Sequence, residues 1–177
     1  MSDFDAAVAC PEDRATLDNL MQLYIHDFSE HWAGTSKGEL ARDGRFAPYP
    51  LDAYWRDAGH IPLLLRLGGN LVGFALLNAS SHSGLPVDRN MAEFFIVRKY
   101  RRDGVGTVAA AAIFSGYPGQ WEAAVARRNV GALAFWRNAV RRHPRVADVE
   151  ESDHDSALWN GPILRFRIEP TGQAFGG

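Results

Sequence analysis

Apolar residues recur along the chain with two different periods, one typical of helices and one typical of strands. Between residues 17 and 28 they return at three- and four-residue steps, which predicts an amphipathic helix. Pro11 precedes this segment and suits the first turn of a helix. Two apolar runs, 61–67 and 71–77, are joined by Gly68-Gly69-Asn70, and this turn chemistry predicts a β-hairpin.

The remaining apolar segments are separated by loops rich in Gly, Pro and polar or charged residues, at 34–50 and 80–90. A meander of antiparallel strands followed by a strand-helix-strand unit predicts an α/β (α+β) domain, with a mixed sheet and helices on its faces. Further strands are predicted around 6–9, at 91–97, at 121–126 and, as a final edge strand, at 163–168; further helices are predicted at 51–57, 107–114 and 130–140.

The composition predicts a single domain spanning 1–177. Of the 177 residues, 46% are apolar and 23% charged, as in soluble globular proteins. The 19 basic and 21 acidic side chains give a formal net charge of −2, which favours neither nucleic acid nor an anionic membrane as the main partner. Polar residues break the most apolar region, so we expect no membrane span and a cytoplasmic location. The single cysteine, Cys10, and the scattered histidines argue against a disulfide and a metal site.

The segment 98–106 is a basic, glycine-containing turn between a predicted strand and a predicted helix. Such a turn presents backbone N–H groups and the positive end of the helix dipole, which together bind a pyrophosphate. Gly104 and Gly106 leave room for the phosphates where a Cβ would block them. A Walker A loop is excluded because no Lys follows Gly106, and a Rossmann fingerprint is disfavoured because Ala109 stands at its third glycine.

Two motifs at a defined separation resemble those of a known family. Arg101-x-x-Gly104-x-Gly106 resembles the Arg/Gln-x-x-Gly-x-Gly/Ala signature of GNAT acetyltransferases, and the segment 129–136, an Asn-x-x-Ala followed by an aromatic pair, resembles their second motif. The segment 93–106 is also similar to spermidine/spermine acetyltransferases and to a group of bacterial "predicted acetyltransferases". The resemblance implies a central mixed, mostly antiparallel sheet of six to seven strands, a splayed parallel pair and about four flanking helices.

The resemblance further implies acetyl-CoA as co-substrate. The backbone of Ile96 and Val97 would pair with the pantetheine arm, while Asn129 and Trp136 would lie beside the cofactor. The pyrophosphate would be held at the turn, by Arg101 and by the backbone N–H groups of Arg102, Asp103, Gly104, Val105, Gly106 and Thr107.

Acyl transfer to an amine needs a neutral nucleophile, so a base or a desolvated site must remove a proton from the ammonium. Glu93, on the strand 91–97, is the first candidate base, and Glu122, on the neighbouring predicted strand, is the second. Both also have a structural interpretation as partners of an arginine. Tyr24 and Asp27 are the candidate contacts for the acceptor, although the exposed face of an amphipathic helix would have the same composition.

In the family, a tyrosine of the second motif usually protonates the departing thiolate, but Trp136 stands at that position here. An indole N–H is not a useful proton donor. Either the thiolate leaves without being protonated, or another residue, such as Tyr24, donates the proton.

The sequence therefore predicts an N-acyltransferase that moves an acetyl group directly to a primary amine of a small molecule or peptide. Because Trp136 stands in place of the family's tyrosine, a catalytically silent acyl-CoA-binding regulatory module remains an alternative. A third interpretation is a turn that binds another phosphate ligand, such as a nucleotide. A homodimer is left open.

Overall fold

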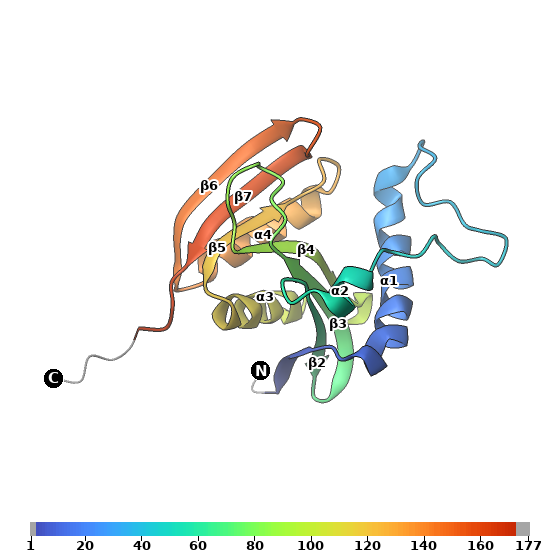
Figure 1. Ribbon diagram of the computed structural model, residues 1–177, viewed down its shortest axis with the longest axis horizontal. Helices are drawn as coiled ribbons and strands as arrows, with labels where there is room; N and C mark the ends of the chain where they lie inside the picture. Colours follow the sequence, from blue (N-terminus) through green and yellow to red (C-terminus); the bar gives the residue numbers. More distant parts are fainter. Residues whose placement is uncertain (1–2, 173–177) are drawn as a thin grey trace.

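The computed structural model describes residues 3–172, which form a seven-stranded sheet with helices on both faces (Figure 1). The strands follow the order β1-β2-β3-β4-β5-β7-β6, and β4 and β5 form the parallel pair. The strands are β1 (Phe4–Val8), β2 (Ile61–Leu67), β3 (Asn70–Asn78), β4 (Arg89–Ile96), β5 (Gly119–Ala124), β6 (Val146–Asp155) and β7 (Asn160–Ile168); the helices are α1 (Arg14–Phe28), α2 (Asp52–Arg56), α3 (Val105–Gly116) and α4 (Val130–Arg142).

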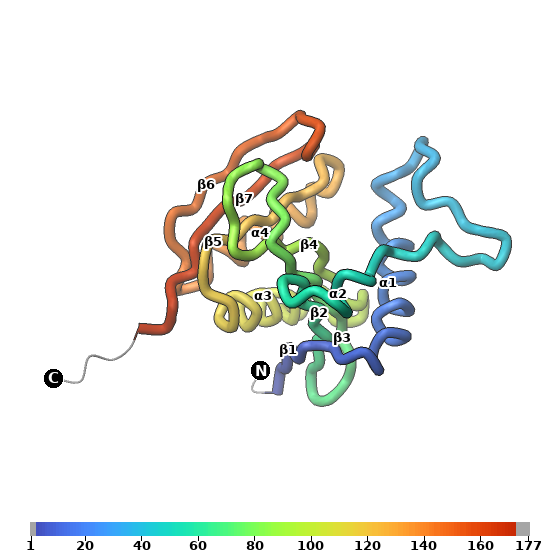
Figure 2. The backbone as a smooth tube through the Cα atoms, viewed as in Figure 1, coloured from blue at the N-terminus to red at the C-terminus, as the bar shows by residue number. Residues whose placement is uncertain are grey.

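The first half of the sheet is a meander that begins at β1 and ends at β4. The hairpin of β2 and β3 forms where the sequence predicts it, because Gly68 and Gly69 take the positive φ angles of 57° and 74° that the turn requires. Short 3₁₀ turns precede and follow α1, at Pro11–Asp13 and Ser29–Trp32. Figure 2 follows the long loop after α1 as it projects away from the sheet and returns to α2.

The second half of the sheet corrects one prediction and adds a strand that the sequence does not reveal. The sequence pattern predicts an edge strand at 163–168, but β7 lies between β5 and β6. The edge strand is β6, most of whose residues are exposed. Because an exposed edge strand needs no apolar alternation, the acidic segment Val146–Asp155 carries no strand pattern.

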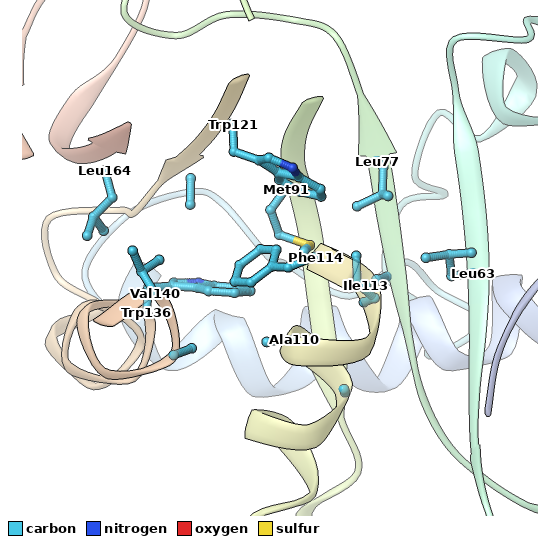
Figure 3. Close-up of a cluster of buried hydrophobic side chains, with 14 of the residues drawn as sticks. Leu63, Leu77, Met91, Ala110, Ile113, Phe114, Trp121, Trp136, Val140 and Leu164 are labelled. Carbon is cyan, nitrogen blue, oxygen red and sulfur yellow. The ribbon is translucent and has the colours of Figure 1, made fainter. Parts of the chain in front are cut away.

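Two hydrophobic clusters hold the helices to opposite faces of the sheet. Under α3 and α4, the rings of Phe114, Trp121 and Trp136 pack together with aliphatic side chains of β2, β3 and β7 (Figure 3). On the other face, α1 and α2 pack on β2, β3 and β4, with Leu17 and Phe74 fully buried. Among residues 3–172, no helix is both long and apolar enough to cross a membrane.

Strands β3 and β4 approach each other so closely that one position excludes a side chain. Gly73 pairs with Ile96, and a Cβ at Gly73 would lie 1.9 Å from the carbonyl oxygen of Phe95. The backbone oxygen cannot move away without breaking the ladder that positions β4.

Replacing Gly73 with alanine should therefore lower the free energy of unfolding by roughly 2–4 kcal/mol. The matched control is Gly131→Ala, at the exposed start of α4, where an added Cβ has nothing within 4 Å and alanine favours the helix. Urea unfolding of both variants tests this; equal stability of the two would contradict it.

Candidate functional site

The parallel strands β4 and β5 stay together for only a short distance. Along these two fully described strands, the paired residues are Arg89 with Trp121 and Asn90 with Glu122. Beyond Asn90 the strands part, as the sequence analysis predicted for the central pair. A register shift in the pairing of β4 with β3, around Ala92, bends β4 at the point of separation.

The parting of the strands opens a cleft of about 700 Å³ between α1, β4, α3 and α4. Phe94 and Phe135 stack across its floor, with ring centroids 5.6 Å apart. Most of the residues predicted to bind the cofactor line this cleft, namely Ile96, Arg101, Arg102, Gly104, Gly106, Thr107, Asn129 and Trp136; Val97, Asp103 and Val105 are not part of its lining.

The start of α3 forms one end of the cleft. Gly104 precedes the helix with φ 80°, a left-handed conformation that favours glycine. Within the described residues, α3 has no side-chain cap, and the N–H of Val108 is the first to bond within the helix, to the carbonyl of Gly104. The N–H groups of the first turn, from Val105 to Thr107, therefore lack intrahelical partners and can bind an anion.

Arg101 fixes this turn to β4 and to α1. Its Nε donates to the carbonyl oxygen of Ile96 at 2.6 Å, its guanidinium lies 5.3 Å from the ring centroid of Phe95, and its Nη2 pairs with Asp27. Arg98 pairs with the same carboxylate at 2.9 Å. Burial alone would raise the pKa of Asp27, but the two arginines outweigh it and hold that pKa below its ordinary value.

Asp27, predicted to contact the acceptor, is thus already engaged as an anchor of the turn before α3. Tyr24, one helical turn earlier, has a different environment and borders the cleft. The two residues share one face of α1. Of the two, Tyr24 is the one that contacts β4, because its hydroxyl donates to Glu93.

The backbone of β4 corrects one predicted cofactor contact. The N–H of Val97 donates to Val72 at 2.9 Å, and its carbonyl accepts from Tyr100 at 2.9 Å, so both polar groups have partners. Because backbone groups alternate in direction along a strand, those of Phe94 and Ile96 face the gap instead. The N–H of Ile96 can therefore pair with a ligand that enters between the strands, although its carbonyl already accepts from Arg101. Val97 cannot pair with such a ligand without breaking the sheet.

The second motif shapes the opposite wall. Asn129 caps α4, as predicted, with its Oδ1 accepting the N–H of Ala132 at 3.0 Å. Trp136 is only 6% exposed and packs against Phe94 and Phe114. It belongs to the core and forms part of the cleft floor, where a tyrosine would present a hydroxyl.

Glu93 points to the face of β4 that carries α1. The hydroxyls of Tyr24 and Tyr49 both donate to its carboxylate, that of Tyr49 at 2.8 Å. Burial raises the pKa of Glu93, and the two hydrogen bonds offset this only in part. Burial and the neighbouring carboxylate raise the pKa of Tyr24 and of Tyr49 as well, so both hydroxyls remain protonated donors. A carboxylate with a raised pKa is suited to accept a proton near neutral pH.

Glu122, the second predicted carboxylate, lies outside the cleft. It is 0% exposed and holds the loop between β3 and β4, accepting from the backbone N–H of His82 at 2.5 Å and from the hydroxyl of Ser83 at 2.7 Å. Arg165 of β7 pairs with it at 3.0 Å. Burial alone would raise its pKa, but these hydrogen bonds lower it to about 2. A carboxylate so strongly held in its charged form is a poor base, so Glu122 has the structural role that the sequence left open.

The sequence analysis missed Tyr49, Phe94 and Phe135. Tyr49 lies in the loop between α1 and α2, 44 residues from Glu93 in sequence. A lone tyrosine between two prolines carries no signal that could have predicted this contact. In residues 3–172, no group of three or more His, Cys, Asp or Glu side chains is arranged to hold a metal ion.

No protein-family model matches the chain, and no curated protein matches it. Solved structures do match along nearly the whole chain. An acetyltransferase from Thermus thermophilus has a TM-score of 0.65 at 19% identity, covering 94% of this chain and 97% of that one.

Two ligand-bound structures are also similar. For an aminoglycoside acetyltransferase in complex with coenzyme A and kanamycin, the TM-score is 0.61 at 13% identity, with coverage of 93% and 94%. For a spermidine N-acetyltransferase from Vibrio cholerae in complex with CoA and spermine, the TM-score is 0.58 at 10% identity, covering 95% of this chain and 96% of that one. These similarities confirm the predicted fold, which is that of the GNAT acetyltransferases.

Because the pKa of Glu122 lies near 2 in the folded chain and near 4.5 in the unfolded chain, its ionisation stabilises the fold by about 3 kcal/mol above pH 4.5. This contribution disappears as the pH falls toward 2. Glu122→Gln should lower the free energy of unfolding at pH 7 by about 2–4 kcal/mol, since Arg165 loses its buried partner.

Urea unfolding between pH 7 and pH 2 should also show a weaker pH dependence in the variant than in the native protein. Unchanged stability together with a loss of catalytic activity would contradict this structural role and would indicate that Glu122 takes part in the reaction.

Proposed function

We propose that this protein is an acetyl-CoA-dependent N-acyltransferase that moves an acetyl group directly to a primary amine of a small molecule. The observation that carries the proposal is the uncapped start of α3, which opens into the cleft where β4 and β5 part. Two of the similar acetyltransferases were solved with coenzyme A, which supports the same ligand class here.

The diphosphate of acetyl-CoA would bind the N–H groups from Val105 to Thr107, and Arg102 beside them is exposed and positively charged. The pantetheine arm would run along β4 and bond to the backbone of Ile96 and Phe94, as an added strand does. The thioester would then lie between the parted strands, and a backbone N–H of β4 would stabilise the oxyanion that develops.

Glu93 would act as the base. It takes one proton from the ammonium, and the neutral nitrogen attacks the thioester carbonyl carbon. A C–N bond forms and the C–S bond breaks, so the CoA thiolate leaves. The second proton lost by the nitrogen passes to the thiolate, and Glu93 returns its own proton to solvent. A thiolate is a good leaving group, so the step does not depend on a tyrosine at position 136.

Placing a negative charge in the first turn of α3 tests the diphosphate site. Thr107→Glu suits a helix start, where acidic residues are favourable, but repels the phosphates. We expect acetyl-CoA to bind at least ~10-fold more weakly than to the neutral, isosteric control Thr107→Gln, with equal melting temperatures. Calorimetric titration measures both affinities, and equal affinity of the two variants would contradict the site.

Removing the carboxylate of Glu93 tests its role as base. Glu93→Gln should lower kcat by about 10²–10⁴-fold while the acetyl-CoA affinity stays unchanged. Because a base works only when deprotonated, native kcat/KM should fall as the pH drops through the raised pKa of Glu93. The variant should lose this acid limb.

The matched control is Glu150→Gln, an exposed carboxylate on β6 that should leave the rate profile unchanged. Binding of acetyl-CoA without turnover in the native protein, across a broad panel of amines, would favour the catalytically silent module instead.

A further inference from the structure

A second cavity of about 300 Å³ adjoins the cleft beside α1. It is enclosed by α1, by the loop between α1 and α2, and by one residue of β4, Glu93. Tyr24 and Phe28 line both this cavity and the cleft, so their rings form the shared wall. A molecule in the second cavity is therefore separated from the parted strands by a single layer of side chains.

Glu93 lies at the end of the second cavity that adjoins the sheet, and its carboxylate is the acidic group placed there by β4. Tyr24 and Tyr49 each donate one hydrogen bond to it. No cation pairs with Glu93 among the salt bridges of residues 3–172, although both other acidic groups discussed above, Asp27 and Glu122, have arginine partners. A cationic ligand would supply the missing positive charge.

Aromatic residues are the largest group among those that line this cavity. Phe28 packs against Tyr24 and Trp32, with ring centroids 5.7 and 5.1 Å apart, and Phe46 and Tyr49 line the cavity from the loop. Such rings contact apolar groups, and their faces also attract a cation. A volume near 300 Å³ is at the small end of ligand pockets, so the occupant is a small molecule.

The charges of the lining residues restrict the ligand further. The described residues that line the cavity include two carboxylates and neither Lys nor Arg. Glu93 is enclosed, whereas Glu39 is exposed on the loop, where water screens its charge. One enclosed carboxylate can balance one ammonium group, and each further ammonium of a polycation would have to leave water for an aromatic wall.

We propose that the acceptor is a small primary amine with a single positive charge and an apolar, preferably aromatic, body. Its ammonium binds Glu93, and its body lies against Phe28, Trp32 and Phe46. This assignment rests on the function proposed above, because the deprotonated nitrogen must reach the thioester in the adjoining cleft. It distinguishes the protein from the similar structures solved with spermine and kanamycin, which carry several amines.

The ring of Phe46 can be removed without breaking the hydrogen bonds that hold the loop between α1 and α2. The side chain of Gln22 holds the backbone of Phe46 through two hydrogen bonds, one from the N–H of Phe46 at 2.9 Å and one to its carbonyl at 3.2 Å. These bonds do not involve the ring. Leu40 pairs with Phe46 across the loop, is 58% exposed and does not line the cavity, so Leu40→Ala is a matched control.

The experiment measures CoA release at saturating acetyl-CoA with 2-phenylethylamine, propylamine, spermidine and kanamycin. For the native protein we expect kcat/KM for 2-phenylethylamine to be about tenfold or more above propylamine, and higher still above spermidine and kanamycin. Phe46→Ala should raise KM for 2-phenylethylamine about tenfold, with less than about a twofold change for propylamine. Leu40→Ala should change neither value.

Calorimetric titration of the native protein with acetyl-CoA distinguishes a failure of the proposed function from a failure of the acceptor assignment. If acetyl-CoA does not bind, the proposed function is wrong. If it binds but spermidine or kanamycin is the better acceptor, the acceptor assignment is wrong and the function stands. If it binds and none of the four amines is acetylated, the acceptor assignment is wrong, and turnover with the broad amine panel described above decides whether the function is wrong as well. An equal loss for both monoamines in Phe46→Ala would also overturn the assignment of the ring to the acceptor body.

Discussion

The site exists because the pairing of β4 and β5 stops after two residue pairs. A central strand normally bonds to neighbours on both sides, and buried backbone groups without partners are costly. Here the N–H groups of Phe94 and Ile96 face a gap, so the fold accepts an incomplete sheet that a ligand with its own amide groups can complete. The cleft and the start of α3 that opens into it both follow from this one interruption.

Contacts beside the interruption tie the turn before α3 to α1. Arg101 reaches back to the carbonyl of Ile96 and at the same time pairs with Asp27. Through this bridge the helix that carries Tyr24 is fixed relative to the turn at the start of α3. The same helix face therefore positions the proposed diphosphate site through Asp27 and borders the proposed acceptor cavity through Tyr24, one helical turn away.

The sequence predicted those parts of the site whose physical causes are local. The glycine turn before α3 and the Asn129 cap of α4 each depend on residues within a few positions, and both are found where expected. Strand β6 escaped prediction because an exposed edge needs no hydrophobic alternation. Which of Ile96 and Val97 faces the gap could not be predicted, because the register between β3 and β4 decides the direction of their N–H groups and is set by long-range pairing. Tyr49 belongs to the same class, since only folding brings its loop to Glu93.

The two carboxylates on β4 and β5 have pKa values that differ in a way that local sequence does not predict. Each lies beside a bulky aromatic residue, Phe94 or Trp121, and the sequence offers both as candidate bases, with Glu93 first. Glu122 is surrounded by donors from the loop between β3 and β4 and by Arg165, and its pKa falls to about 2.

Glu93 receives two neutral hydroxyls and forms no salt bridge within residues 3–172, and burial raises its pKa. The difference arises because the hydrogen bonds that Glu122 accepts from His82, Ser83 and Arg165 outweigh the effect of burial on its pKa, whereas the two tyrosine hydroxyls that bond to Glu93 do not. The strand that parts from its neighbour therefore carries the carboxyl group whose pKa is raised, and the strand that stays paired with β7 carries the one whose pKa is lowered.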